Sequence, residues 1–390
     1  MLRFHTAGES HGQCLTAWVS GLPLGVPIDV AFINRELRRR QAGYGRGGRM
    51  KIERDRVQIL SGVRHGKTIA APITLQIENK DWTHWEDALP VEDDPALAAK
   101  QRRLTQPRPG HADLAGALKF NLKDARYVVE RASARETAAR VAAGAVAKLF
   151  LHPFGIEVLS HVVAIGSVRL ARQAEWEEIV AACEETDAQT RCVEPKLGTA
   201  MKKLIDQATA DRDSLGGVFE VVAHGVPPGL GSHAHWDEKL DGRLAQAILS
   251  IQAVKAVEIG AGVTAAAAFG SQVHDEIGYD SVKSSFTRPT NYAGGIEGGI
   301  SNGKDIVVRG YLKPISTLRR PLPSVDLVTK EKVKAAYERS DVCVVPAAGV
   351  IGEAMVALVL AWAVREKFGG DTLEEALRSS EAYRQQLREF

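Results

Sequence analysis

The sequence predicts a layered α+β fold with antiparallel β-sheets. Strand-like and helix-like segments do not alternate regularly along the chain, which disfavours a doubly wound parallel sheet. The length of 390 residues and a hydrophobic content of 45% are ample for a large core. No internal repeat, linker or low-complexity tail is found. We therefore expect a single domain over residues 1–390, with a peripheral C-terminal helix from about residue 371.

Short segments that alternate in polarity or are rich in β-branched residues predict strands. They are Leu15–Val19, Arg56–Leu60, Ile73–Ile77, Tyr127–Val129, Glu157–Ile165, Val218–Ala223 and Ile306–Leu312. Segments with helical periodicity predict helices. They are Asp29–Gln41, Ala134–Phe150, Trp176–Thr186, Ala200–Thr209, Asp237–Val254, Ser324–Arg339, Ala347–Lys367 and Leu373–Arg388.

The most apolar segment, residues 342–364, has about the length of a membrane span. It also contains a proline, two glycines, Glu353 and many alanines, which favours a buried helix beginning near Ala347. Its small side chains would let a second helix approach closely, within the fold or across a subunit interface. We expect no membrane partner.

Charge and cysteine content restrict the class of protein. The 50 basic and 48 acidic side chains leave a net charge of +2, which argues against a general nucleic-acid binder. The 4 cysteines form no C-x-x-C pair, as expected of free thiols in the cytoplasm. The amino terminus, MLRFHTAGESHG, lacks the apolar run of a signal peptide.

Positive charge is nevertheless concentrated between Arg35 and Arg49, where the sequence reads RELRRRQAGYGRGGR. Arginine matches carboxylate and phosphate oxygens bidentately, and glycine lets the backbone approach a ligand. The run Arg38–Arg40 alone could be a solvated helix end. Arg46 and Arg49 follow the helix in a glycine loop, so the segment predicts a small anionic ligand.

Two nucleotide motifs match only in part. The glycines in GYGRGG fit G-x-G-x-x-G, but they follow a helix, whereas a dinucleotide fingerprint follows a strand. Gly298, Gly303 and Lys304 match most of a phosphate-binding loop, but Asp305 replaces the required hydroxyl residue and an extended run follows. Neither match predicts a nucleotide site.

Two histidines next to glycines are candidates for proton transfer. His11 lies in TAGESHG and His111 in RPGHAD, without the apolar pattern of core residues. A histidine can give or take a proton near neutral pH, and Arg108 could hold an anionic substrate against His111.

Three further segments are candidates for binding. Ser133 has N-cap and capping-box spacing with Glu136, at a helix start that also carries Arg131 and Arg135. The segment Lys313–Thr317 offers a cation and hydroxyls after a strand, suiting a phosphate or a flavin. Asp341 could pair with Arg339 or accept a proton beside a cofactor.

These segments together resemble the chorismate synthase family from residue 1 to about 365. The resemblance rests on TAGESHG, RRRQAGYGRGGR, RPGHAD, RASARETAARVAAGA, HWDEKLDGRLAQAILSIQAVKAVEIG, AGGIEGGISNGKDIVVRGYLKPIST and ERSDVCVVPAAGVIGEAM. It implies an α+β sandwich with a helical layer between antiparallel β-sheets, assembled as a homotetramer. It also implies a 1,4-elimination of phosphate and a ring proton from 5-enolpyruvylshikimate 3-phosphate, the seventh step of the shikimate pathway.

The resemblance implies a requirement for reduced FMN, with NADPH as a source of reducing equivalents, and assigns roles to residues. His11 corresponds to the histidine that protonates the leaving phosphate, His111 to the one that protonates the flavin, and Asp341 to the aspartate that removes the ring proton with the flavin. Ser10 and Ser133 match serines nearby. The family's arginines around substrate and cofactor correspond to Arg40, Arg46, Arg49, Arg108, Arg135 and Arg339. Arg40 and Arg46 also match a nicotinamide nucleotide site.

The FMN contacts implied by the resemblance are Arg131, Ala132, Ser133, Gln252, Ala253, Gly298, Lys313, Pro314, Ile315, Ser316, Thr317 and Arg339. Two positions depart from the commonest family form, Ala132 in place of serine and Gln252 in place of asparagine. Neither removes a charged group, so they put only individual flavin contacts in doubt.

Two other functions stay open at this point. An RNA-binding protein could use Gly43–Arg49 as an RGG-like segment, although such proteins carry repeated units or interleaved aromatics and only one unit is present. The other open function is that of a flavin reductase that uses FMN and a nicotinamide nucleotide. The sequence leaves open whether this chain reduces its own flavin.

Overall fold

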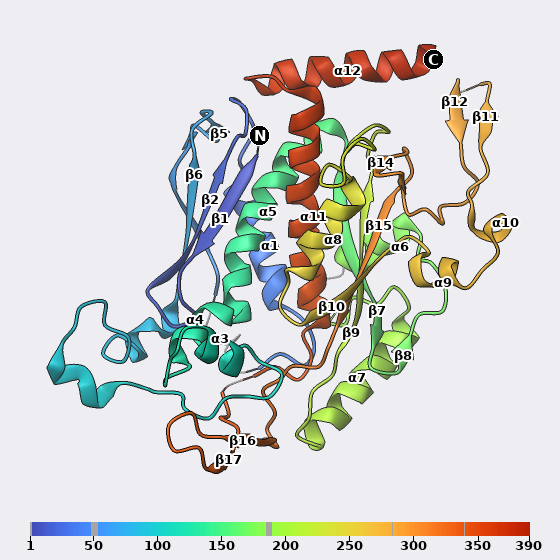
Figure 1. Ribbon diagram of the computed structural model, residues 1–390. Helices are drawn as coiled ribbons and strands as arrows, with labels where there is room; N and C mark the ends of the chain where they lie inside the picture. The colour runs from blue at the N-terminus through green and yellow to red at the C-terminus, as the bar shows by residue number, and fades with distance from the viewer. Residues whose placement is uncertain (1, 48–53, 185–188, 283, 339) are drawn as a thin grey trace.

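The computed structural model describes residues 2–47, 54–184, 189–282, 284–338 and 340–390. In Figure 1, three helices lie between a sheet on the left and a sheet on the right: α1 (Val30–Gln41), α5 (Thr137–Leu151) and α11 (Val345–Phe368). Helix α5 contacts the left sheet, and α11 contacts both α5 and the right sheet. The expected α+β class is therefore confirmed.

The left sheet has the strand order β1-β2-β6-β3, with every neighbouring pair antiparallel. Its strands are β1 (Arg3–Ala7), β2 (Cys14–Ser20), β6 (Ile73–Glu78) and β3 (Val57–Ser61). Along β2 the buried residues alternate, and Leu15 and Val19 pair with Ile77 and Ile73 of β6. This alternation places one apolar face of the sheet against α5.

The right sheet has the order β10-β15-β9-β7-β8 and is also antiparallel. Its strands are β10 (Val254–Ile259), β15 (Ile306–Leu312), β9 (Gly217–His224), β7 (Glu157–Ile165) and β8 (Val168–Arg169). Strand β7 contacts α11 as well as α6 (Trp176–Glu184) and α7 (Pro195–Ala210). Because helices cover both faces, β7 is buried almost continuously instead of alternating.

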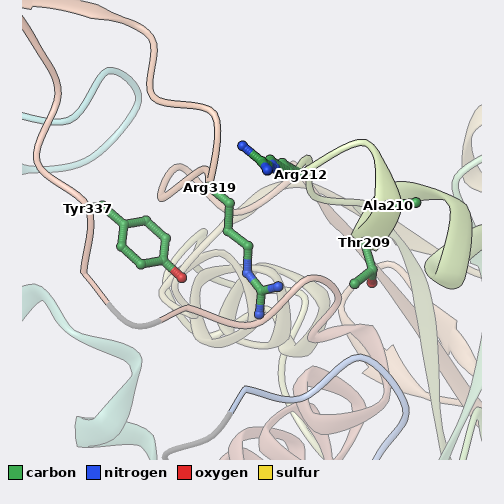
Figure 2. A pocket seen from close by; sticks show the side chains of 5 residues that line it. All are labelled: Thr209, Ala210, Arg212, Arg319 and Tyr337. Carbon is green, nitrogen blue, oxygen red and sulfur yellow. The ribbon is translucent and has the colours of Figure 1, made fainter.

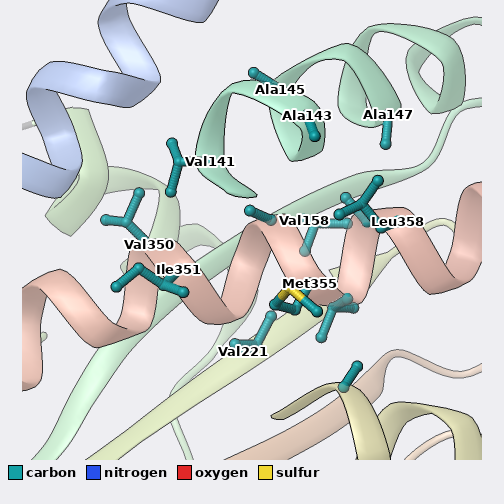
Figure 3. Close-up of a cluster of buried hydrophobic side chains, with 14 of the residues drawn as sticks. Val141, Ala143, Ala145, Ala147, Val158, Val221, Val350, Ile351, Met355 and Leu358 are labelled. Atoms are coloured by element: carbon teal, nitrogen blue, oxygen red, sulfur yellow. The ribbon is translucent and has the colours of Figure 1, made fainter. Parts of the chain in front are cut away.

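Helices α5 and α11 form the centre of the core (Figure 3). A Cβ added at Gly144 of α5 would lie 2.3 Å from the Cβ of Ala354 in α11, so glycine lets the two helices approach this closely. Helix α11 is long and apolar enough to span a membrane, but 94% of its most apolar window is buried inside the fold. The prediction of a buried, closely approached helix is confirmed, and the helix begins at Val345.

The remaining elements are shorter and lie around these layers. The helices are α3 (Asp113–Lys119), α4 (Arg126–Ala132), α8 (Leu240–Leu249), α9 (Gly262–Ala266), α10 (Gly270–Val273) and α12 (Leu373–Glu389). The 3-10 helices are η1 (Lys80–His84), η2 (Pro95–Lys100), η3 (Ala134–Glu136) and η4 (His152–Phe154). Two-stranded pairs are β4 (Val63–Arg64) with β5 (Lys67–Thr68), β11 (Gly278–Asp280) with β12 (Ser285–Thr287), β13 (Ile296–Glu297) with β14 (Ile300–Ser301), and β16 (Pro323–Val325) with β17 (Lys332–Lys334).

Two sequence predictions are wrong in type. The segment Tyr127–Val129 lies inside helix α4, where Val129 packs with buried residues of α3 and neighbouring loops, so tertiary contacts override its β-branched character. The segment predicted as a helix from Ser324 contains the β16–β17 hairpin instead. Its turn is stabilised by Asp326, whose side chain accepts hydrogen bonds from the backbone of Val328 and Thr329.

Several predicted bounds also change. Helix α7 begins at Pro195, five residues before the predicted start at Ala200. Helix α8 ends at Leu249 and not at Val254, which belongs to β10. The predicted end of the helix after Trp176 falls partly on residues 185–188, outside the described residues. Strands β1 and β10 and helix α3 were not predicted.

Candidate active site

His11 is held by contacts on its backbone, its ring nitrogen and its ring face. Its Nδ1 lies 2.9 Å from Oε1 of Glu130, and its backbone N–H donates to Oε2 at 2.8 Å. The ring stacks on Trp85 with a centroid distance of 4.0 Å and an interplanar angle of 22°. Burial opposes ionisation of Glu130, but hydrogen bonds from His11 and the charge of Arg126 lower its pKa. Glu130 is therefore an anion that fixes the ring orientation and stabilises a protonated imidazole.

Ser10 and Ser133 meet beside this histidine. The Ser10 hydroxyl lies 3.0 Å from the Ser133 hydroxyl, and the Ser10 backbone N–H donates to the carbonyl of Glu130 at 2.8 Å. Ser133 is the N-cap of η3, and its hydroxyl accepts from the backbone N–H of Arg135. The N-cap prediction is confirmed for this turn, which leads directly into α5. The predicted capping box is not formed, because Glu136 has other partners.

Two of the predicted arginines converge on one carboxylate. Arg40 Nη2 lies 2.7 Å from Oδ2 of Asp55, and Arg135 Nη1 lies 2.5 Å from Oδ1. Arg40 and Arg135 are only 3% and 5% exposed. Burial, with the charges of Arg135 and Arg46, lowers the pKa of Arg40 to about 10, which still leaves it charged at neutral pH. Two buried cations thus share one buried anion.

Asp341 pairs with Arg46, which lies in the glycine loop. Arg46 Nη1 is 2.7 Å from Asp341 Oδ2, and the backbone N–H of Gly47 donates to Oδ1. The predicted alternative partner, Arg339, and the predicted ligand Arg49 lie outside the described residues. The predicted arginine loop and the predicted proton acceptor, far apart in sequence, are therefore in direct contact.

His111 belongs to a second charged cluster. Its Nδ1 bonds to Oδ1 of Asp113, and Arg108 donates to both oxygens of the same carboxylate at 2.8 and 3.0 Å. Burial opposes ionisation, but His111 and Arg108 hold the pKa of Asp113 well below its ordinary range. Arg108 also donates to the hydroxyl of Thr317 at 3.0 Å. This contact joins the RPGHAD segment to Lys313–Thr317.

Glu136 brings together two of the predicted cofactor residues. It accepts from Gln252 Nε2 at 3.2 Å and from the Thr6 hydroxyl at 2.7 Å, and that hydroxyl accepts from Arg131 at 2.7 Å. Arg140 supplies a second cation at 3.0 Å. Burial opposes ionisation, but Arg140 and these hydrogen bonds lower the pKa of Glu136.

A series of contacts links the clusters around the two serines, Glu136 and His111. Gln252 precedes Ala253, whose carbonyl accepts from the backbone N–H of Lys313 at 3.0 Å, and the Lys313 ammonium donates to the carbonyl of Gly110. Gly110 directly precedes His111. The series therefore runs from the two serines through Arg131, Glu136 and Lys313 to His111. Further along the same segment, the carbonyl of Ile315 accepts from Ser214.

Gly298 is a predicted FMN-binding residue that has no part in this series of contacts. It lies in the turn between β13 and β14 with a φ of +61°, and the neighbouring Gly299 carbonyl accepts from the backbone of Leu240 at the start of α8. Ala132 ends α4, and the described residues give its side chain no polar contact.

Sequence reasoning missed the acidic partners of the site, Glu130, Asp113, Asp55 and Glu136, as well as Trp85. The sequence held a signal for one of them, since Asp113 stands two residues after His111 in RPGHAD. Asp55 and Trp85 reach the site only through tertiary packing. No group of metal-ligating side chains occurs among the described residues.

Two hollows in the described part of the chain lie elsewhere. One of about 360 Å³ is lined by Thr209, Ala210, Arg212, Arg319 and Tyr337 (Figure 2). The other, of about 990 Å³, lies beside α1 and α6. Neither is lined by His11, His111 or Asp341, so the clusters described above are identified by their chemistry and contacts, not by a large cavity.

Comparisons with known proteins agree with the resemblance seen in the sequence. The family model described as "Chorismate synthase" matches residues 2–364. The chain is 61% identical over 390 residues to the chorismate synthase of Solibacter usitatus, covering 100% of both, and 53% identical over 396 residues to that of Aquifex aeolicus, covering 100% and 99%. A solved structure titled "Crystal Structure of Chorismate Synthase" matches with a TM-score of 0.80 and 44% identity, covering 100% of this chain and 99% of that one.

Proposed function

The chain belongs to the chorismate synthase family of lyases in the shikimate pathway, and we propose that the linked arginine and histidine clusters form its active site. Its reaction is the 1,4-elimination of phosphate and a ring proton from 5-enolpyruvylshikimate 3-phosphate to give chorismate, a step of aromatic amino acid biosynthesis. The substrate carries one phosphate and two carboxylates, so its binding requires several fixed cations.

The observation that carries this proposal is the sharing of Asp55 by Arg40 and Arg135. Arg40 and Arg135 place two buried cations against this carboxylate, and the Nε atom of Arg40 is buried without a hydrogen-bond partner among the described residues. A buried cation without full compensation is costly unless an anion joins it. We assign Arg40, Arg135 and Arg46, together with Arg49 beyond the described residues, to the acidic groups of the substrate.

His11 is positioned to deliver a proton to the leaving phosphate. Its Nδ1 is engaged by Glu130, and we assign the proton transfer to Nε2. Stacking on Trp85 fixes the plane in which that proton is presented. Ser10 and Ser133 place hydroxyl groups beside the same ring, where they can orient a phosphate oxygen.

His111 is positioned by the same principle in the second cluster. Asp113 engages its Nδ1, and Arg108 holds that carboxylate in place and lies 3.5 Å from Nε2, the nitrogen to which we assign the proton transfer. By the family pattern this proton goes to the flavin. Asp341, which pairs with Arg46, is assigned to the removal of the ring proton.

The residues present fit FMN. When bound, reduced FMN supplies electron density while phosphate leaves and recovers it as the proton departs. Gln252 offers a buried amide oxygen without a partner in the described residues, and Lys313 offers a cation at the edge of the same contact series. We assign the cofactor to Arg131–Ser133, Gln252, Ala253, Lys313–Thr317, Gly298 and Arg339. Reduction by NADPH through Arg40 and Arg46 is proposed from the family pattern alone.

We also propose that residues 1–390 form one domain of the family's sandwich type with α12 peripheral, and that it acts in the cytoplasm as a homotetramer without nucleic-acid or membrane partners. The apolar hairpin β11–β12 supports subunit contact, because Val282, Tyr279 and Phe286 are 93%, 57% and 56% exposed. Light scattering on the purified chain tests the tetramer.

An anaerobic assay with chemically reduced FMN tests the proposed function. Chorismate and phosphate should form in equal amounts when substrate and reduced FMN are both present, and in the absence of any nicotinamide nucleotide. Addition of NADPH and oxidised FMN without substrate tests flavin reduction separately. Oxidation of NADPH together with no chorismate under the first condition would favour the flavin reductase.

A further inference from the structure

A further buried charge cluster, separate from those of the candidate active site, lies where α1, α5, α11 and β7 meet. Glu353 of α11 accepts from Arg39 at 2.7 and 2.8 Å, from Lys148 at 2.5 Å and from the Ser160 hydroxyl at 2.6 Å. Glu36 bonds to the same two cations at 2.8 and 2.6 Å. None of these groups has a role in the site proposed above.

Arg191 is the unbalanced member of this cluster. It is 7% exposed, its φ is +54°, and its Nη1 is fully buried without a hydrogen-bond partner among the described residues. Its nearest acidic atom is Oε1 of Glu353 at 3.7 Å, which is too far for a hydrogen bond. A guanidinium held in this way loses its hydration without recovering an acceptor.

Among the residues that the structure describes, the charges of the cluster do not cancel. The cations are Arg39, Lys148 and Arg191, and the anions are Glu36 and Glu353, which leaves one positive charge. Burial opposes ionisation of Glu353, but Arg39 and Lys148 lower its pKa to about 2, and the pKa of Glu36 is also lowered. The neighbouring thiol of Cys183 cannot supply the missing anion, because burial raises its pKa.

A cavity of about 990 Å³ adjoins this cluster. Arg191, Arg39, Lys148 and Cys183 line it, together with Arg35 and Arg38 of α1. Its acidic lining residues other than Glu36, namely Asp29, Glu157 and Glu184, are solvent-exposed. Exposed carboxylates are screened by water and cannot neutralise a buried guanidinium. The Arg191 side chain therefore lines a space large enough for a small molecule.

We propose that this cavity binds a small oxyanion, a carboxylate or phosphate group, through Arg191, with Arg39 and Lys148 adding positive charge. The site is separate from the proposed active site. Adjacent residues of α1 serve the two clusters, Arg39 contacting Glu353 and Arg40 contacting Asp55. The proposal does not depend on the proposed function.

Calorimetric titration with inorganic phosphate tests it on the full chain. Wild type is compared with Arg191→Gln and with the matched control Arg378→Gln, which changes an exposed arginine of α12. Wild type and the control should each bind one more phosphate per chain than Arg191→Gln. Arg191→Lys, which keeps the charge but loses the fork, should bind that phosphate roughly tenfold or more weakly. The same stoichiometry in wild type and Arg191→Gln would overturn the proposal.

A second measurement keeps the test independent of whether the variant folds. Crystals of the wild-type chain soaked in bromide should show an anomalous peak within hydrogen-bonding distance of the Arg191 guanidinium. A wild-type cavity without such a peak would contradict the proposal. Bromide bound at the active-site arginines would give peaks there and not at Arg191, so the two sites are distinguished by position.

Discussion

Nδ1 of His11 lies 2.9 Å from Oε1 of Glu130, a residue 119 positions further along the chain. The same carboxylate accepts the backbone N–H of His11 at 2.8 Å, so both the ring and the main chain of the histidine are fixed by one side chain. A proton donor held in this way presents a single nitrogen to its substrate. We therefore propose that Glu130 positions His11 for proton transfer to the leaving phosphate.

Glu130→Gln should lower kcat by roughly ten- to a hundredfold while substrate binding changes little. Glutamine keeps the shape of the side chain but removes the charge that stabilises a protonated His11. Steady-state kinetics with reduced FMN measure the effect. Glu338→Gln is the control, because Glu338 shares the partner Arg126 but does not touch His11. Equal losses in both variants would assign the effect to Arg126 instead.

Asp113→Asn should lower the rate of the chemical step by roughly two orders of magnitude or more, a loss similar to that of His111→Ala. Asparagine cannot stabilise a positive charge on His111 and releases Arg108 from its ion pair. Single-turnover decay of the substrate measures the rate. A double variant that is no slower than either single one shows that the two residues act as a unit. Full activity of Asp113→Asn would remove this carboxylate from the mechanism.

Asp341→Asn should leave FMN bound and slow substrate decay, if the carboxylate accepts the ring proton. The structure pairs Asp341 with Arg46, so a purely structural role predicts loosening of the glycine loop in this variant. Arg46→Ala is the comparison, and it should weaken substrate binding by about 1.5 to 3 kcal/mol with little change in melting temperature. Weak FMN binding with normal decay in Asp341→Asn would contradict the catalytic role.

Glu353→Gln should destabilise the chain at neutral pH by about 3 to 5 kcal/mol, because it removes one of the two buried anions that Arg39 and Lys148 share and leaves them with Glu36. Interactions in the folded state depress the pKa of Glu353 to about 2 from an ordinary value of 4.5. Its contribution to stability is therefore complete above pH 4.5 and lost as the pH falls toward 2. Denaturant unfolding at several pH values measures this. As the pH falls from 4.5 toward 2, the free energy of unfolding should decrease less in the variant than in wild type. Parallel pH profiles would contradict the assignment.

Gly144→Ala should destabilise the fold by about 1 to 3 kcal/mol through overpacking, because the new Cβ would meet Ala354 at 2.3 Å. Gly242→Ala in α8 is the matched control. Its Cβ would meet nothing closer than 3.7 Å, so the better helix propensity of alanine should leave stability unchanged or raised. Thermal melts compare the two. A neutral Gly144→Ala would show that the α5–α11 contact can relax.

The sequence was informative where local pattern and final environment agree. Strand β15 was predicted with its observed bounds, and α11 was recognised as buried despite its length, because Glu353 and the glycines do not suit lipid. Prediction failed where tertiary contacts decide. Val129 is β-branched but packs as part of a helix, and the turn at Asp326 converts a helix-like period into a hairpin.

In the candidate site, too, the sequence indicates the residues that a local pattern marks and misses those that only tertiary packing brings together. Histidines and arginines in glycine-rich loops stand out in a sequence, and His11, His111, Arg40 and Arg46 were selected for that reason. Their acidic partners do not stand out. Asp55 has no local signal that it lies between Arg40 and Arg135, since that contact exists only after α1 and α5 are packed together.

The central claim is that these clusters are the active site of a chorismate synthase, and one anaerobic single-turnover measurement tests it most directly. Wild type and His11→Ala are each mixed with reduced FMN and 5-enolpyruvylshikimate 3-phosphate, and chorismate is followed with time. The account predicts stoichiometric chorismate from wild type, and formation slowed by roughly two to four orders of magnitude in the variant with its fold intact. Formation of chorismate at the same rate in both, or none from wild type, would contradict it.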